Sequence, residues 1–330
     1  MAADAPHPAF EGYATEAVPQ AAVGSPGKDG VLELTFERTA DGTTLVHDYA
    51  TVPFHISGTL GHDPHPDANT VFVQSPTGGV AQGDRHDVSI TVGDEAVAHV
   101  STQSSTKVQT MTCNYAAADT TLSVGAGGHL DYVPEPTILH ADSRYVQEMT
   151  VDLSPGATAV VSDVVVPGRL ARGERFEFER YLSRVRGTGP DGLLFEDATH
   201  LTPEDRDPTV PGVLGEFTVY GTTFVLAPDH DESELSDALH AAVTDDEARP
   251  VRQHSPTGPA LRSVLWVTGP RPSRRRSTRP GTTPDRNCWT RPRRPGGSTD
   301  AGRRHLSRPP RRRDRCGRYR YVGPRYGRAL

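Results

Sequence analysis

Hydrophobic and polar positions alternate along most of this chain between residues 31 and 267. Residues 31–38 show the pattern well, because apolar and polar side chains follow one another there (Leu32, Leu34 and Phe36 against Glu33, Thr35 and Glu37). A period of two is typical of a β-strand with one buried face. The same reading predicts strands over residues 31–38, 43–49, 52–57, 70–74, 87–92, 96–103, 121–124, 129–133, 145–153, 157–166, 176–184, 193–200, 216–220, 222–226 and 260–267.

Turn residues separate these predicted strands. They fall at Gly42, Gly58, Gly61, Gly93, Gly127, Gly128, Pro155, Gly156, residues 187–192 and Gly221. Many short strands joined by regular turns indicate a mainly β fold, built as a many-stranded sandwich, a barrel or stacked sheets.

One segment has a helical period instead. Residues 231–247 begin with acidic side chains and repeat apolar positions at spacings of three and four. We expect an amphipathic helix there, capped by Asp229 or Asp231 and stopped by Pro250. The body is therefore predicted to be mainly β with one or two helices.

The two ends of the chain lack such patterns. Residues 1–30 begin with a stretch rich in Ala, Pro and Asp, without the basic-then-apolar order of a signal peptide, and they predict a disordered leader. No apolar run reaches about 18 residues, so no transmembrane helix is expected. The predicted organisation is a leader over 1–30, a β-rich domain over 31–267 and a disordered tail over 268–330.

Charge divides the chain sharply. The whole sequence holds 35 Lys and Arg against 42 Asp and Glu, and residues 271–330 account for 20 of the basic residues and 3 of the acidic ones. Residues 1–270 therefore hold 15 basic and 39 acidic side chains, a net charge of −24, while the tail carries +17. An acidic body with only two lysines indicates adaptation to high salt, where mutual repulsion between carboxylates is screened.

Two explanations of the arginine-rich tail stay open. It is either a segment that binds nucleic acid through phosphates or the product of a frameshift in a GC-rich gene. Both make the tail disordered, because it cannot bury a core. Cys113, Cys288 and Cys316 form no metal or disulfide spacing, which fits a reducing, cytoplasmic setting.

Three polar strings between the predicted strands are candidates for function. The first, residues 78–84, contains Gly78, Gly79, Gly83 and Asp84. No Lys-Ser/Thr pair and no helix follow it, so a nucleotide loop is disfavoured and a wide turn capped by Asp84 is expected.

The second string, Pro134-Glu135-Pro136, holds one carboxylate between two residues of fixed φ. It is either a rigidly presented contact or metal ligand, or a stiff connection between strands. In the third string, Gly168 and Arg169 precede Gly173 and Glu174, and we expect an Arg–Glu ion pair that organises the loop.

Two further groups of residues are weaker candidates for a functional site. Ser104 and Lys107 would form a hydrolase site only inside a pocket, and a polar strand edge with Lys107 paired to a carboxylate is the favoured reading. His62, Asp63, His65 and Asp67 are metal-ligand types at short spacing, but a solvated loop is the favoured reading. The chain shows no strong catalytic motif.

Taken together and in order, the strings resemble the urease accessory protein UreD family, also called UreH. The resemblance covers about residues 32–267. It rests on residues 76–84, 101–108, 130–138 and 167–174, and on the Phe176-Glu177-Phe178 segment that follows.

This resemblance implies a β-rich, non-enzymatic scaffold for urease maturation. Such a scaffold binds apo-urease with UreF and the GTPase UreG and helps deliver nickel, with no tightly bound cofactor of its own. The matching positions that would serve as partner-binding motifs are Gly78, Gly79, Gly83, Asp84, Lys107, Pro134, Glu135, Pro136, Gly168, Arg169, Gly173 and Glu174. Asp84, Glu135 and Glu174 are the candidates for transient nickel contacts.

The chain departs from the family pattern at two places. Asp163 stands where many members have Glu, and the arginine-rich tail replaces a C-terminal helical, apolar segment. Two alternative functions are a nucleic-acid-binding protein acting through the tail and a β-fold hydrolase using Ser104, Lys107 or a His–carboxylate site.

Overall fold

The computed structural model describes residues 5–18, 27–61, 63, 65–211, 213–215, 217–231 and 233–237, together with the backbone of residues 249–254 and 260–267. Its elements are η1 (Pro8–Phe10), α1 (Glu11–Ala14), β1 (Asp29–Thr39), β2 (Gly42–Ala50), β3 (His55–Leu60), β4 (Asn69–Gln74), β5 (Arg85–Val92), β6 (Val97–Thr102), β7 (Thr106–Val108), β8 (Ala116–Val124), β9 (His129–Tyr132), β10 (Thr137–Leu139), β11 (Arg144–Leu153), β12 (Thr158–Val166), η2 (Leu170–Arg172), β13 (Arg180–Gly189), β14 (Gly192–Leu201), β15 (Val219–Leu226), β16 (Arg249–His254) and β17 (Ala260–Val267). The prediction of a mainly β fold of stacked sheets is confirmed.

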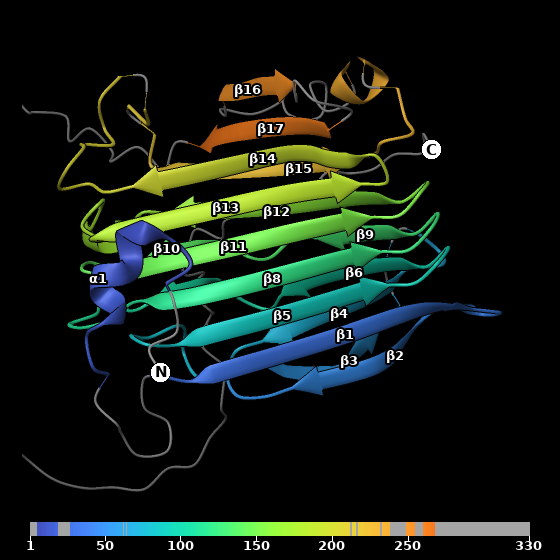
Figure 1. Cartoon of the computed structure of the whole chain (residues 1–330), viewed down its shortest axis with the longest axis horizontal. Helices are drawn as coiled ribbons and strands as arrows, with labels where there is room; N and C mark the ends of the chain where they lie inside the picture. Colours follow the sequence, from blue (N-terminus) through green and yellow to red (C-terminus); the bar gives the residue numbers. More distant parts are fainter. Residues whose placement is uncertain are drawn as a thin grey trace, which may run out of the picture. The chain divides into compact units, whose positions relative to one another are not determined.

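The strands form two sheets that lie face to face (Figure 1). The seven-stranded sheet has the order β14-β13-β11-β8-β5-β1-β2. The ten-stranded sheet has the order β16-β17-β15-β12-β9-β6-β4-β3, with β10 pairing β12 and β7. Apolar side chains from both inner faces form one core that includes Phe36, Ile90, Leu122, Leu130 and Phe224.

The centre of each sheet is parallel, which the alternation did not predict. Strands β1, β5, β8, β11 and β13 run parallel in one sheet, and β4, β6, β9 and β12 run parallel in the other. Parallel neighbours need a crossover connection. Here the chain crosses from one sheet to the other and back. A strand of the opposite sheet therefore makes the crossover connection that a helix makes in other parallel folds.

This winding places two kinds of connection at opposite ends of the strands. Tight turns join β5 to β6, β8 to β9 and β11 to β12, and they are stacked by backbone bonds such as Glu95 N–H to Ala126 O (2.9 Å) and Gly127 N–H to Pro155 O (3.1 Å). The return connections are longer, and they all lie at the other end. We call this the long-loop end, made of residues 75–84, 103–115, 133–143 and 167–179.

Several predicted boundaries were wrong. Gly58 lies inside β3 at a bulge, and Gly221 lies inside β15, which is one strand rather than two. The predicted strand over 176–184 begins only at Arg180. The short strands β7 and β10 were not predicted, because their pairing partners are distant in sequence. The edge strand β16, which pairs with the adjacent β17, was not predicted either.

The predicted helix over 231–247 is described only at residues 233–237, which are helical. Asp231 caps it, since its carboxylate accepts the N–H of Ser233 (2.8 Å) and of Glu234 (3.1 Å). Pro250 lies in the edge strand β16, where proline is tolerated. The remaining residues of the predicted helix, 232 and 238–247, and the tail over 268–330 lie outside the described residues.

Residues 5–18 differ from the disordered leader expected over 1–30. They form η1 and α1 and pack against the seven-stranded sheet, as Figure 1 shows. Phe10 is fully buried, with its ring 5.1 Å from that of Tyr115. Glu16 pairs with Arg144 at 2.9 Å. Tyr13 adds to these contacts, since its hydroxyl donates to Glu179 at 2.6 Å. Packing and polar contacts with the sheet therefore order a segment whose composition predicts disorder. Within the described part of the chain, no helix has the length and apolar character needed to cross a membrane.

Candidate functional site

The long-loop end brings all the predicted strings together. Val80 in the first string forms a parallel bridge with Val108, and β7 pairs in turn with β10. β10 then pairs with the end of β12, so that Ile138 lies opposite Val166 just before the third string begins. The buried side chains of Val80, Val108, Leu139 and Val165 share one apolar cluster beneath these loops. Four segments up to about 90 residues apart thus form one continuous structure.

The Asp84 side chain holds the first string in place through hydrogen bonds. Its side chain is fully buried and accepts three backbone N–H groups at 2.9 Å each, from Gly27, Lys28 and Ala81. The expected cap of the turn is present, because the Asp84 N–H also donates to Ala81 O. Both carboxylate oxygens of Asp84 are used inside the protein, so this turn does not present the carboxylate at the surface.

Glu174 and Arg169 form the expected ion pair. Arg169 Nε donates to Glu174 Oε2 at 2.7 Å, and a second guanidinium nitrogen contacts the same oxygen. Glu174 Oε1 accepts the N–H of Ala141 at 3.0 Å, which joins the third string to the segment that follows β10. Burial would raise the pKa of the Glu174 carboxyl, but the hydrogen bonds from Arg169 and Ala141 outweigh burial and lower this pKa. Glu174, which is 8% exposed, organises the loop from within rather than presenting itself.

Glu135 differs from the other two candidate carboxylates. Its N–H donates to Thr102 Oγ1 at 2.9 Å, and Pro136 O accepts the N–H of Thr106 at 3.1 Å, so the string is a stiff connection between β9 and β10. Within the described residues, the half-buried Glu135 carboxylate makes no hydrogen bond or ion pair.

Lys107 occupies an exposed position in β7, while its carbonyl accepts the N–H of Val80 at 2.8 Å. The expected pairing of Lys107 with a carboxylate is absent from the part of the chain that the structure describes. Ser104 is also exposed, and neither residue lines a described hollow. The arrangement therefore lacks the enclosed Ser–Lys pair that the hydrolase alternative requires.

His140 is the residue of this end that sequence reasoning missed. It follows β10 directly, is 8% exposed, and its N–H donates to Val108 O at 3.0 Å. Burial lowers the pKa of its imidazole, and the positive charge of Arg169 lowers it further. The sequence position of His140, shortly after the second string, was the signal that could have identified it as a residue of this end.

Metal binding finds no preformed site in the described residues. No group of three or more His, Cys, Asp or Glu is arranged there to hold an ion. Of the His- and Asp-rich loop, His62 lies outside the described residues. Asp63 lies 3.6 Å from His99, and His65 accepts the N–H of Asp67 at 3.3 Å. These contacts are those of an ordinary polar loop.

Asp163 lies between the sheets within a hydrogen-bonded group. Its Oδ2 accepts from Gln147 (2.7 Å), Ser183 (3.0 Å) and Tyr181 (3.2 Å). Burial raises the pKa of the Asp163 carboxyl, although these hydrogen bonds act in the opposite direction. The shorter side chain at this position is therefore fully integrated in the fold.

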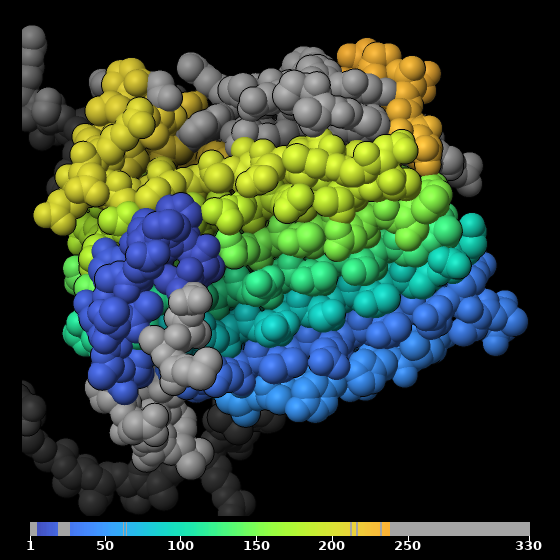
Figure 2. Space-filling model, in the orientation of Figure 1, coloured from blue at the N-terminus to red at the C-terminus, as the bar shows by residue number. Residues whose placement is uncertain are grey.

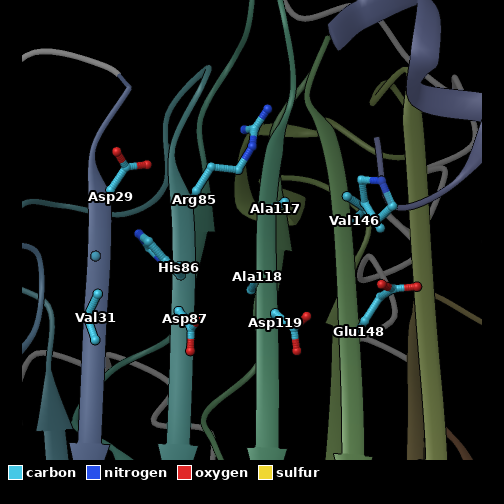
Figure 3. A pocket seen from close by; sticks show the side chains of 12 residues that line it. Asp29, Val31, Arg85, His86, Asp87, Ala117, Ala118, Asp119, Val146 and Glu148 are labelled. Atoms are coloured by element: carbon cyan, nitrogen blue, oxygen red, sulfur yellow. The ribbon is translucent and has the colours of Figure 1, made fainter. Parts of the chain in front are cut away.

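A separate hollow of about 380 Å³ lies on the outer face of the seven-stranded sheet (Figure 3). Strand register lines up Asp87, Asp119 and Glu148 across β5, β8 and β11. Burial raises the pKa of Asp119, and the charge of Asp87 adds to the effect. Arg184 forms an ion pair with Glu148, with a nitrogen–oxygen distance of 2.9 Å. None of the predicted site residues lies in this hollow.

Comparison with known proteins agrees with the arrangement of the strings. The family model of the UreD urease accessory protein matches residues 28–267. A urease accessory protein UreD of Haloarcula marismortui is 90% identical over 258 residues, covering 78% of this chain and 86% of that protein. Proteins of the same name from Natronomonas pharaonis and Haloquadratum walsbyi are 48% identical over 234 residues and 40% identical over 253 residues. Those matches cover 71% and 75% of this chain and 78% and 83% of the relatives. The chain therefore belongs to the UreD family of urease accessory proteins.

Proposed function

We propose that this protein is a non-catalytic scaffold for urease maturation, which binds apo-urease together with UreF and UreG in the cytoplasm. The observation that carries the proposal is the match of the family over residues 28–267, a range that includes every string of the long-loop end. The relatives carry the name urease accessory protein. GTP hydrolysis belongs to UreG in this proposal, which agrees with the absence of a phosphate-binding motif in the sequence.

The long-loop end is the docking surface in this proposal. Its loops are set by close backbone contacts rather than by flexible side chains. A Cβ on Gly79 would lie 2.1 Å from Lys107 O, and one on Gly168 would lie 2.4 Å from Glu174 O. A surface that is already ordered loses little conformational entropy when a partner binds.

Nickel is the cargo of the scaffold rather than its cofactor. A relay must release the ion, and oxygen ligands suit weak, transient binding of this kind. Asp84 and Glu174 use their oxygens within the fold, whereas the Glu135 carboxylate is free of partners among the described residues. Glu135 is therefore the candidate whose carboxylate oxygens are most available to a nickel ion.

The test is reconstitution of urease in molar salt with a version of the chain that ends at residue 267. Co-purification of this protein with urease subunits, UreF and UreG is the expected result. Failure to associate with any of them overturns the proposal. For nickel transfer, Glu135→Gln is compared with Glu177→Gln, which removes an exposed carboxylate from the same end. We expect only the first variant to lower the nickel content of urease while leaving complex formation unchanged.

A further inference from the structure

Basic side chains are scarce in the acidic body, yet the long-loop end holds four of them. Arg175 donates to the carbonyl of Phe217 at 2.7 Å, and three remain. Lys107 comes from the connection between β6 and β8, and Arg169 and Arg172 come from the connection between β12 and β13. We call these three residues the cationic cluster. Residues 1–270 contain only 15 basic residues against 39 acidic ones. The occurrence of three of these basic residues together at the proposed docking surface therefore suggests that they have a role there.

Backbone contacts place the three residues around His140. β7 pairs with β10 so that Lys107 lies opposite Ile138, two residues before His140. On the other side, Ala141 donates to the carboxylate of Glu174, which also holds Arg169. The N–H of Arg172 donates to Arg169 O at 2.7 Å, which keeps the two arginines in one tight turn. Burial is the main reason why the pKa of the His140 imidazole is lowered. The positive charges of Arg169, Lys107 and Arg172 add to this effect and the charge of Glu174 opposes it, which agrees with this closeness.

Two of the three cations in this cluster have no carboxylate partner among the described residues. Glu174 is committed to Arg169, and the charge of the exposed Glu177 also acts on Arg169. Lys107 and Arg172 are exposed, and neither side chain makes an ion pair or hydrogen bond within the described residues. Two cations therefore stay available for a ligand on a surface whose backbone is already ordered.

We propose that the cationic cluster binds an acidic segment of a partner protein in the urease assembly. This inference rests on the proposed scaffold function and adds the chemistry of the contact. The body as a whole carries a large excess of carboxylates, which disfavour an acidic partner, so the two unpaired cations of the cluster define the one position and orientation in which we expect that partner to bind. A nucleotide phosphate is a poorer fit, because the three-residue η2 turn offers no helix N-terminus and the cations are spread over two loops.

High salt defines how such a contact works. At about 1 M salt the Debye length is about 3 Å, so charges attract only in direct contact. The cluster then acts through charge-assisted hydrogen bonds to carboxylates, for which arginine is well suited. The cluster therefore determines where the partner docks and does not increase the rate of association.

Charge reversal at the cluster tests the proposal. Arg172→Glu and Lys107→Glu are compared with Arg206→Glu, which makes the same charge change at another exposed loop arginine. Binding of each variant to the assembled apo-urease–UreF–UreG complex is measured in molar KCl, with thermal unfolding to check folding. We expect the dissociation constant to rise about tenfold for each cluster variant and less than about twofold for Arg206→Glu. Arg172→Lys keeps the charge and should stay close to the original protein.

Each outcome has a distinct meaning. Equal binding of Arg172→Glu, Lys107→Glu and Arg206→Glu overturns the inference but leaves the scaffold function intact, because the original chain still associates. Failure of the original chain to bind any partner overturns the scaffold function itself. Inorganic phosphate is tested as a separate probe. If phosphate binding is lost in Arg172→Glu while partner binding is unchanged, the cluster is a small-anion site and the proposed protein contact is wrong.

Discussion

Arg169 and Glu174 lie five residues apart and close the loop between them, with Arg169 Nε 2.7 Å from Glu174 Oε2. The same carboxylate reaches across to Ala141 through Oε1, at 3.0 Å. One acidic side chain therefore fixes the shape of the third string and joins it to the chain that follows β10. The long-loop end depends on this link for its order.

Replacement of Glu174 with Gln should loosen the long-loop end. The variant keeps a hydrogen-bond acceptor but loses the charge that holds Arg169, so we expect the melting temperature to fall by about 3 °C. The folded-state pKa of Glu174 lies below its ordinary value, so its stabilising effect is present above about pH 4.3 and is lost as the pH falls through the folded-state pKa. The difference between the two proteins should therefore shrink in acid. Unfolding curves at pH 3 and pH 7 check this, and an equal difference at both pH values contradicts it.

Asp84→Ala should destabilise the whole fold. The substitution leaves three backbone N–H groups, those of Gly27, Lys28 and Ala81, without the buried carboxylate that accepts them. We expect the free energy of unfolding to fall by about 3–5 kcal/mol, as when a buried polar network loses its central member. Denaturant unfolding measures the loss. Asp41→Ala, at an exposed position, is the control and should stay within about 0.5 kcal/mol of the original chain.

Gly79→Ala and Gly78→Ala form a matched pair. Both glycines have positive φ values, +122° and +85°, so both substitutions strain the backbone. Only at Gly79 would the new Cβ meet Lys107 O, at 2.1 Å, and so break the bridge between the first string and β7. Gly79→Ala should therefore reduce association with the urease assembly far more than Gly78→Ala. Equal loss in both variants would show that backbone strain alone is responsible.

Phe10→Ala should release the N-terminal segment. Phe10 is fully buried against Tyr115, and large-to-small substitution of a buried Phe costs about 3–5 kcal/mol. Because that loss is local to residues 5–18, limited proteolysis should cut this segment much faster while the β body stays intact. Glu11→Ala, at an exposed position of α1, is the control and should be cleaved at the original rate.

Asp163→Asn should remove one source of pH dependence. Burial raises the folded-state pKa of Asp163, so the stabilisation from its protonated form is complete below about pH 4 and is lost as the pH rises through the folded-state pKa. An Asn side chain does not ionise. The free energy of unfolding of the variant should therefore improve relative to the original chain between pH 4 and pH 7. Urea unfolding at fixed salt measures it, and parallel pH curves for the two proteins would refute the effect.

The alternation of apolar and polar residues determined the β class and most strand positions, since burying one face of a strand leaves a local period of two. Residues 31–38 fall inside β1, and residues 145–153 fall inside β11. The Arg169–Glu174 pair was also predictable, because its two members are close in sequence. Local pattern, however, contains no information about which strands are neighbours.

Tertiary structure alone decided the parallel pairing and, with it, the long-loop end. The crossing of the chain between two sheets brings Val80, Val108 and Ile138 into adjacent rows, although they are far apart in sequence. It also buried Asp84 and Glu174, two of the three candidate nickel contacts, because their oxygens accept backbone N–H groups of distant segments. The order of the strings along the chain was enough to indicate the family. Their convergence, and the meeting of Lys107 with Arg172 beside His140, required the fold.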